Sequence, residues 1–188
     1  MIRQRIARRF AWIASLVLLG GLVLPTMASA KTPQEIDASV DAALANFRSQ
    51  VRGGDTFLRD AQAVLVFPGV VQAGFGVGGE FGEGELRIHG EDAGYYSLGA
   101  ASVGFQFGAQ VKDVFIVFLQ RQALENFRAK HGFTVGVDGS IVLVNLGAEA
   151  SINTTTLNQP VVGVIVGQKG LMYNLTLQGS KISRIYPH

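Results

Sequence analysis

The sequence contains no cysteine and only three histidines, His89, His131 and His188. The absence of cysteine excludes disulfides, a lipid-modified cysteine at a processing site, and zinc held by thiolates. The histidines lie far apart in the sequence, so they indicate no metal centre either. We therefore expect neither a metal nor a cofactor.

Residues 1–30 follow the order of a secretory signal peptide. Four arginines lie among the first nine residues, residues 10–24 are uncharged and mostly apolar, and Ala28-Ser29-Ala30 supplies small residues at the cleavage positions. An uncleaved anchor is the alternative, but an apolar run of about 15 residues is short for a span of about 20. We expect export by the general or the twin-arginine route, cleavage after Ala30, and a periplasmic or membrane-associated location in the cell envelope.

Cleavage would change the charge of the protein. Four of the 16 basic residues lie in residues 1–30, which leaves 12 basic residues against 14 acidic ones, a net charge of about −2. A general nucleic-acid binder carries a basic stripe, so the composition excludes that class. No linker or charge block divides residues 31–188, and their length is typical of a single domain.

An amphipathic helix is predicted at the start of this domain. Thr32 and Glu35 form a capping-box pattern around Pro33, which suits the first helical turn. Apolar residues then recur at helical spacing, at Ile36, Val40, Ala43, Leu44, Phe47 and Val51. This apolar face packs against the rest of the domain, or else the face or the late arginines, Arg48 and Arg52, meet a membrane.

Glycine alternates with apolar residues along two predicted strands. In residues 74–84 glycine fills most even positions, and Phe75, Val77 and Phe81 lie at odd ones. Residues 100–110 repeat the pattern of one small-residue face and one apolar face. A glycine run in a strand marks a close approach, a bulge or a bend. We therefore expect another element to pack within backbone distance of Gly76.

The remaining segments are predicted as short strands with two short helices. The two helices are expected near 56–62 and at 123–129. Buried strands are expected at 64–67 and at 114–119, and Pro68 is expected to end the strand at 64–67. A hairpin turn at Asp138-Gly139 is expected to join strands at 133–137 and 141–146. A second turn is expected at residues 168–170, between strands at 161–166 and 171–177. The fold class is α+β: an N-terminal amphipathic helix plus a mostly antiparallel, glycine-rich, barrel-like or sandwich sheet with one short internal helix.

Two motifs look like enzyme sites but have a plainer interpretation. Gly74–Gly79 matches the G-x-G-x-x-G dinucleotide fingerprint, yet the residues that follow do not start the helix that the fingerprint needs. Residues 100–104 resemble a nucleophile elbow around Ser102, with His131 and Asp138 available, but a strand pattern continues where an elbow needs a helix. We expect no catalytic residues and no enzymatic activity.

Three neighbouring carboxylates raise the question of a calcium site. Glu80, Glu83 and Glu85 are close in sequence, and hard cations bind several oxygens. Glu80 has the opposite strand parity to the other two, so a solvated strand end is the simpler interpretation.

Several blocks, in order along the chain, resemble the SYLF domain, the family that includes the yeast YSC-eighty-four-type actin-patch proteins. The blocks are Val64-Leu65-Val66-Phe67-Pro68, residues 73–84, Gly94-Tyr95-Tyr96, residues 102–110, Gly136-Val137-Asp138-Gly139 and Gly167-Gln168-Lys169-Gly170-Leu171. They span roughly residues 36–185. The resemblance implies a module that binds phosphoinositides or other anionic lipids, and in some members actin, with membrane contact through an N-terminal amphipathic helix.

An exported protein of bacterial type would not meet actin or phosphoinositides, so the resemblance implies lipid binding of a more general kind. The first hypothesis is a non-enzymatic protein of the cell envelope that binds phospholipid or a membrane surface. Its candidate headgroup contacts are the cations Arg48, Arg52, Lys112, Arg121 and Lys169. The second hypothesis is a structural or protein-interaction module of the envelope without specific lipid binding, and a serine hydrolase acting through Ser102 is the third. An exposed apolar patch would favour the first.

Processing gives the first testable prediction. If residues 1–30 are a signal peptide, the intact mass of the exported protein should correspond to a chain that begins at Lys31. Mass spectrometry of the protein recovered from the envelope measures this directly. A mass that retains Met1–Ala30 would instead identify an uncleaved anchor.

Overall fold

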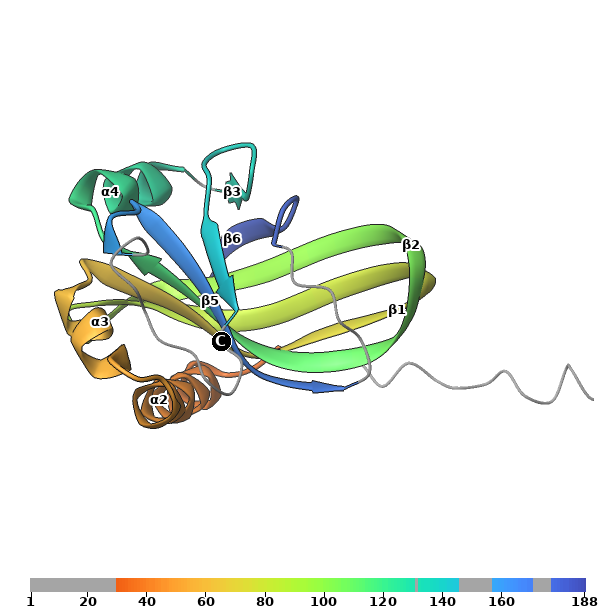
Figure 1. Cartoon of the computed structure of the whole chain (residues 1–188), viewed down its shortest axis with the longest axis horizontal. Helices are drawn as coiled ribbons and strands as arrows, with labels where there is room; N and C mark the ends of the chain where they lie inside the picture. Colours follow the sequence, from red (N-terminus) through yellow and green to blue (C-terminus); the bar gives the residue numbers. More distant parts are fainter. Residues whose placement is uncertain (1–29, 131, 146–156, 171–176) are drawn as a thin grey trace, which may run out of the picture. The chain divides into compact units, whose positions relative to one another are not determined.

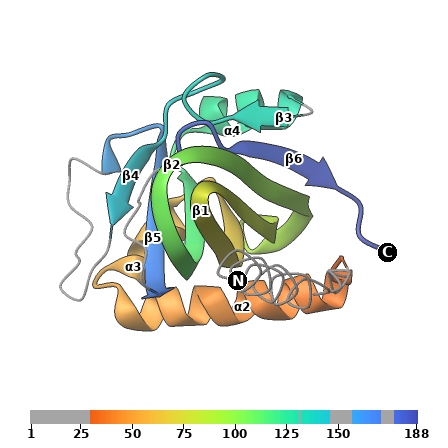
Figure 2. The ribbon, with the colours of Figure 1, turned by 90° about the vertical axis from the view of Figure 1, so that its right-hand side faces the viewer.

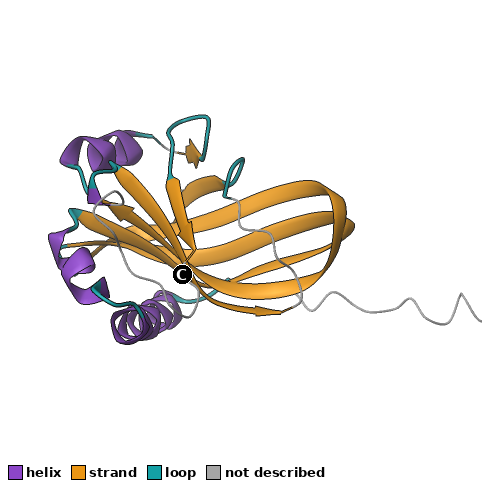
Figure 3. Ribbon diagram, in the orientation of Figure 1, coloured by secondary structure: helices purple, strands orange, loops and turns teal. Residues whose placement is uncertain are grey.

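The described residues are 30–130, 132–145, 157–170 and 177–188 of a computed structural model. Their helices are α2 (Pro33–Gln50), α3 (Gly54–Asp60) and α4 (Arg121–Ala129). Their strands are β1 (Ala63–Ile88), β2 (Glu91–Phe118), β3 (Gly132–Thr134), β4 (Val142–Asn145), β5 (Val161–Gly170) and β6 (Lys181–Ile185). All belong to one compact unit, Lys31–His188 (Figures 1 and 3). The predicted signal peptide lies outside the described residues, apart from Ala30.

Helix α2 begins at the predicted capping box. The Glu35 backbone N–H donates to the Thr32 hydroxyl at 3.3 Å, and the Thr32 N–H donates to the Glu35 carboxylate at 2.8 Å. Every predicted apolar position, from Ile36 to Val51, is buried. These side chains pack against one face of the sheet, and the rings of Phe47 and Phe115 lie 4.7 Å apart. The apolar face of α2 therefore belongs to the core, and the alternative that it meets a membrane is wrong.

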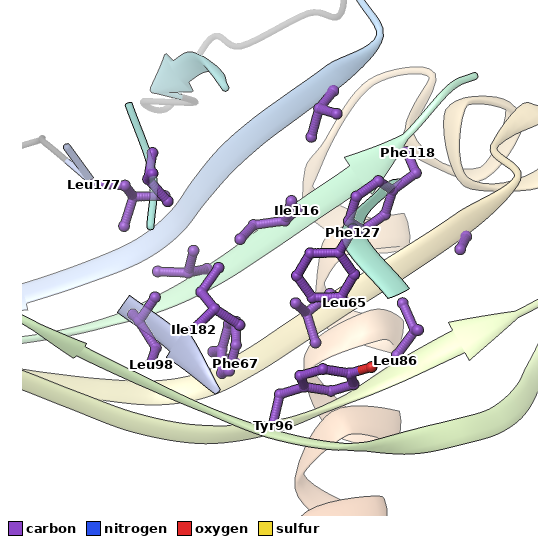
Figure 4. Close-up of a cluster of buried hydrophobic side chains, with 14 of the residues drawn as sticks. Leu65, Phe67, Leu86, Tyr96, Leu98, Ile116, Phe118, Phe127, Leu177 and Ile182 are labelled. Carbon is purple, nitrogen blue, oxygen red and sulfur yellow. The ribbon is translucent and has the colours of Figure 1, made fainter. Parts of the chain in front are cut away.

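The sheet is curled around a second apolar cluster. Its strand order is β3-β6-β2-β5-β4, with β1 paired to β2, and among the described strands β4 and β5 pair in parallel while the other pairs are antiparallel. Figure 2 shows the curl, with α2 running along one side. The concave face holds the buried cluster drawn in Figure 4, to which Leu65, Phe67, Leu98, Ile116 and Phe127 contribute. The predicted α+β class with a curled, mostly antiparallel sheet is confirmed.

The long hairpin of β1 and β2 bends back on itself. At the bend Gly76 has a φ of 72°, a left-handed conformation that side chains rarely adopt, and the register of the pair shifts between Phe75 and Val77. Beyond the bend, β1 returns across its own first half. A Cβ on Gly82 would lie 2.7 Å from Val70 Cγ2, and one on Gly84 would overlap the carbonyl oxygen of Val66. We call this contact the β1 crossing.

The glycine face is therefore a packing face, but not at the position that the sequence suggested. A Cβ on Gly76 would meet no atom within 4 Å, so the expected close approach there is wrong. The close approaches lie at Gly82 and Gly84, and at Gly74, where a Cβ would lie 2.8 Å from Gly78 Cα. Glycine is needed at position 76 instead because the backbone there has a positive φ, 72°.

Pro68 does not end β1, contrary to expectation. It falls at a register shift between Phe67 and Val70, where the strand bulges and Gly69 has a φ of 64°. The Gly69 N–H donates to the Asp113 carboxylate at 2.8 Å. The Asp113 side chain thus accepts the backbone hydrogen bond that the bulge would otherwise leave unmade, and β1 continues beyond the bulge.

The segments on either side of Asp138-Gly139 do not form the predicted hairpin. β3 pairs with β6 and β4 pairs with β5, toward opposite ends of the sheet order. The Asp138 carboxylate accepts the Thr134 N–H at 2.7 Å and the Lys130 ammonium at 2.6 Å, which closes a local turn. The lysine contact lowers the pKa of Asp138.

Two further sequence predictions concern β5 and α4. Residues 168–170 do not form the expected turn, because they continue β5 beyond Gly167, whose φ is 68°. The strand predicted after them, 171–177, lies almost entirely outside the described residues. Helix α4 is confirmed, with Leu124 and Phe127 buried as predicted.

The β1 crossing predicts a large difference between two glycine substitutions. Gly84→Ala should lower the free energy of unfolding by about 1–3 kcal/mol or more, because the methyl group has no room beside Val66. Gly79→Ala is the matched control in the same strand, since its Cβ would meet only the Ala100 carbonyl oxygen, at 3.6 Å. Urea unfolding of both variants measures the difference. Equal stabilities would contradict the crossing.

Candidate functional site

The outer face of the bent hairpin exposes a group of large apolar side chains. The exposed fractions are 82% for Phe75, 67% for Val77, 56% for Phe81, 50% for Val71 and 43% for Val111. Val71 and Val111 pair directly across the two strands. We call these five residues the outer apolar face. Exposed apolar groups of this kind mark interaction sites more often than ordinary surface.

The outer apolar face exists because α2 covers only part of the sheet. Near the start of β1, the outward side chains Val64 and Val66 are buried under α2, as is Phe115 of β2. The bulge at Pro68-Gly69 reverses the parity of β1, so farther along the hairpin the outward side chains are Val71 and Phe75, on a surface that α2 does not reach. Figure 1 shows the bend at the opposite end of the unit from α3 and α4.

The hairpin carries no charged residue over two long stretches. Residues 61–79 and 93–111 contain no Asp, Glu, Lys or Arg. The charged residues that end these stretches near the bend are Glu80 and Lys112, and both side chains point inward, with exposed fractions of 4% and 0%. Lys112 Nζ lies 3.1 Å from Glu80 Oε2 and donates a hydrogen bond to it. The two charges thus neutralise each other beneath the outer apolar face.

Two glutamine side chains complete this buried polar cluster. Lys112 Nζ also donates to Gln72 Oε1 at 3.3 Å, and Gln110 Nε2 donates to the same oxygen at 2.5 Å. Glu80 comes from the returning half of β1, whereas Gln72 comes from the outgoing half, so the cluster links the two arms of the bend. Glu80 Oε1 is buried and accepts no hydrogen bond from the described residues. The interpretation of Glu80 as part of a solvated strand end is wrong.

A second buried carboxylate lies where the hairpin meets α2. Glu85 is fully buried, its Oε1 lies 2.6 Å from Arg87 Nε, and Arg87 Nη2 lies 3.2 Å from Asp41 Oδ1 of α2. Burial raises the pKa of Glu85 to about 7, against the opposing effect of Arg87. The protonated form is therefore favoured in the folded state, and this group's contribution to stability falls as pH rises from about 4.5 to about 7.

The hairpin end and α2 are also tied by two neutral donors. The Tyr95 hydroxyl donates to Asp37 Oδ1 at 2.9 Å, and burial together with this bond raises the pKa of Tyr95. The Lys31 N–H donates to Glu83 Oε2 at 3.2 Å. These contacts are structural, because they hold α2 against the hairpin.

A cavity of about 340 Å³ lies between α2, α3 and the β1–β2 turn. Arg48, Arg59, Arg87 and His89 line it together with Asp55. Asp55 lies 2.9 Å from Arg59 and 3.7 Å from Arg48, and Arg87 is held by Glu85 and Asp41. Because the arginines are already matched by carboxylates, the cavity offers little surplus charge to an anion.

The structure separates the five predicted headgroup cations. Arg52 and Arg121 are exposed, and Arg48 is half-exposed beside Asp55. Lys112 is buried with Glu80, so the expectation that it lies on the surface is wrong. The backbone of Lys169 pairs with that of Val111, at the border of the outer apolar face. Of the five, only Lys169 is thereby placed beside that face.

The rejected enzyme motifs lie within strands. Gly74–Gly79 is part of β1 and starts no helix, so the backbone of a dinucleotide fingerprint is absent from this segment. β2 runs through Ser102, which pairs with Gly78, so the strand-to-helix turn of a nucleophile elbow is not formed there. His131 lies outside the described residues.

Within the described ranges, no group of three or more metal-ligating side chains comes together, and no helix is long and apolar enough to cross a membrane.

Comparison with known families identifies the second half of the chain. Residues 99–185 match the family described as Ysc84, Las17-binding protein actin regulator. Over this range the chain is similar to the Ysc84 (SYLF) family. No curated protein matches the chain.

The Ysc84 match begins at Gly99 in β2 and ends with β6, so it includes α4 and strands β3 to β6. The SYLF resemblance is confirmed over this range. The blocks at 64–68, 73–84 and 94–96 lie before the match, in the same compact unit. The Ysc84 segment therefore contains one strand of the bend, and β1 supplies the other.

Sequence reasoning did not recognise the outer apolar face as a site. Its signal was present in the uncharged stretches 61–79 and 93–111 and in the odd-numbered apolar residues of β1. Alternation alone does not say which face points inward. The β1 crossing decides it, because only the glycine face fits inside the bend.

The buried Lys112–Glu80 pair predicts a strongly non-additive mutant cycle. Lys112→Met should lower the free energy of unfolding by about 3–5 kcal/mol, because it leaves the Glu80 carboxylate buried without a counter-ion. Combining it with Glu80→Leu should recover most of that loss, since apolar pairs of similar volume often replace buried ion pairs at little cost. Urea unfolding of the single and double variants measures the coupling. A double variant no more stable than Lys112→Met would contradict a direct pairing.

Proposed function

We propose that residues 31–188 are a non-enzymatic lipid-binding module that acts at a membrane surface of the cell envelope after export. The observation that carries the proposal is the outer apolar face, five large apolar side chains exposed on an uncharged part of the hairpin. The Ysc84 family match supports it at a coarser level, because the family comprises modules related to membrane or actin binding. A secretory signal would separate the protein from actin, which leaves lipid as the favoured partner.

A protein-interaction module of the envelope is the second candidate function. The same exposed side chains favour it, because apolar patches also mark protein interfaces. The two functions differ in what the purified protein does with lipid alone. A lipid-binding module associates with protein-free vesicles, whereas an interaction module needs its partner.

Vesicle flotation tests the proposal. The protein should float with phosphatidylcholine vesicles and with vesicles that also contain phosphatidylglycerol. Raising the salt from 0.1 M to 1 M shortens the Debye length from about 10 Å to about 3 Å. Binding should persist at high salt, because burial of apolar side chains is not screened. Failure to float with either vesicle type would contradict lipid binding and favour the interaction module.

The predicted cations are tested in the same assay. A cation beside an anionic bilayer contributes on the order of 1 kcal/mol, so Lys169→Gln should lower the affinity for anionic vesicles several-fold. Arg48→Gln/Arg52→Gln is the comparison, because these residues lie at the end of α2, beside α3. If the double variant loses binding and Lys169→Gln does not, the helix end and not the hairpin contacts the membrane.

A further inference from the structure

We infer that the bend of the β1–β2 hairpin inserts into the hydrocarbon boundary of one bilayer leaflet, with Phe75 and Val77 at the inserted tip. This inference rests on the proposed function and names the surface, the occupant and the orientation. Phe75 and Val77 flank Gly76 at the bend and are the two most exposed members of the outer apolar face, at 82% and 67%. Val71, Phe81 and Val111 extend the same surface toward the body of the unit.

The distribution of charged residues along the hairpin favours the hydrocarbon of a bilayer as the partner of the outer apolar face. Charged side chains are costly to bring into a bilayer, and residues 71–79 and 99–111 contain none. Glu80 and Lys112, which end these uncharged runs near the bend, are turned inward and paired at 3.1 Å. An interface with another protein normally has a polar rim around its apolar centre. The described part of the bend places its polar groups underneath the apolar surface and not around it.

The five described side chains of the outer apolar face present, by themselves, too small an area for a stable dimer. A fully exposed aromatic side chain presents about 150–250 Å², so the five side chains at their exposed fractions present roughly 500 Å² together. Two copies joined through this face would bury about 1,000 Å² in total, below the 1,200–2,000 Å² of specific interfaces. Insertion into a leaflet has no such threshold, because a few anchoring side chains suffice for reversible attachment.

The inserted orientation also agrees with the position of α2. Helix α2 buries its large apolar residues against Val64, Val66 and Phe115, and none of its large apolar side chains is left exposed to meet a bilayer. With the bend inserted, α3 and α4 lie at the far end of the unit (Figure 1). The backbone of Lys169, paired with Val111, then lies at the border of the inserted surface.

A single tryptophan at the bend tests the insertion. Trp12, the only tryptophan of the chain, lies in the predicted signal peptide, so Phe75→Trp in the background of residues 31–188 places one fluorophore at the tip. The matched control is Val137→Trp in the same background, because Val137 is 81% exposed in the turn between β3 and β4. Both variants are mixed with phosphatidylcholine vesicles whose acyl chains carry bromine. The tip fluorophore should shift to the blue and be quenched, and the control should do neither.

A charge at the tip gives an independent measurement. Val77→Asp should weaken the binding of phosphatidylcholine vesicles about tenfold or more, because it brings a carboxylate into the inserted surface. Val137→Asp, at a site that is also largely exposed, should leave binding unchanged. Thermal unfolding of both variants verifies that they fold.

The outcomes separate the inference from the proposed function. Association with vesicles without quenching at residue 75 would overturn insertion through the bend and leave lipid binding in place. Absence of any association would overturn both. A dimer that forms in the absence of lipid and is lost in Val77→Asp would overturn the inference in favour of a second copy as the occupant.

Discussion

The β1 crossing is the contact on which the rest of this architecture depends. β1 returns across its own first half so closely that Gly84 lies against the Val66 carbonyl and Gly82 against the Val70 side chain. Only glycine leaves room there, so the glycine face of the strand must point into the bend. Because successive side chains of a strand point to opposite faces, the large apolar residues that alternate with glycine are turned outward. The outer apolar face is thus a geometric consequence of the crossing.

The same constraint explains where the charges of the hairpin lie. Even-numbered residues near the bend share the inward parity, so Glu80 and Lys112 are drawn inside together, where they pair with each other. Taking two ions out of water is costly unless they are paired, and Gln72 Oε1 accepts a further hydrogen bond from the lysine. The result is an exposed surface of apolar side chains above a neutral polar cluster. An apolar exterior over an internally neutralised pair suits contact with hydrocarbon better than contact with water.

The sequence predicted local structure more reliably than the orientation of faces. The Thr32 capping box and the helical spacing from Ile36 to Val51 correctly predicted α2 and its buried face, because both signals are local. The alternation of residues 74–84 correctly predicted a strand, but a period of two is symmetric and does not say which face is buried. Lys112 was taken for a surface cation for the same reason. The Asp138-Gly139 turn was taken for a hairpin because its sequence does not reveal that its flanking strands find partners in β6 and β5.

The most direct test of the crossing is a nuclear Overhauser measurement on the folded protein. Gly82 and Val70 are twelve residues apart in one strand, and an extended strand would separate them by about 40 Å at 3.3 Å per residue. The crossing predicts a strong effect between the Gly82 Hα protons and the Val70 methyl groups, and a second one between Gly84 Hα and the Phe67 ring, whose Cδ1 would lie 2.8 Å from a Cβ on Gly84. Absence of both effects, with the β1–β2 cross-strand effects intact, would show that the hairpin is open and would contradict the inward glycine face.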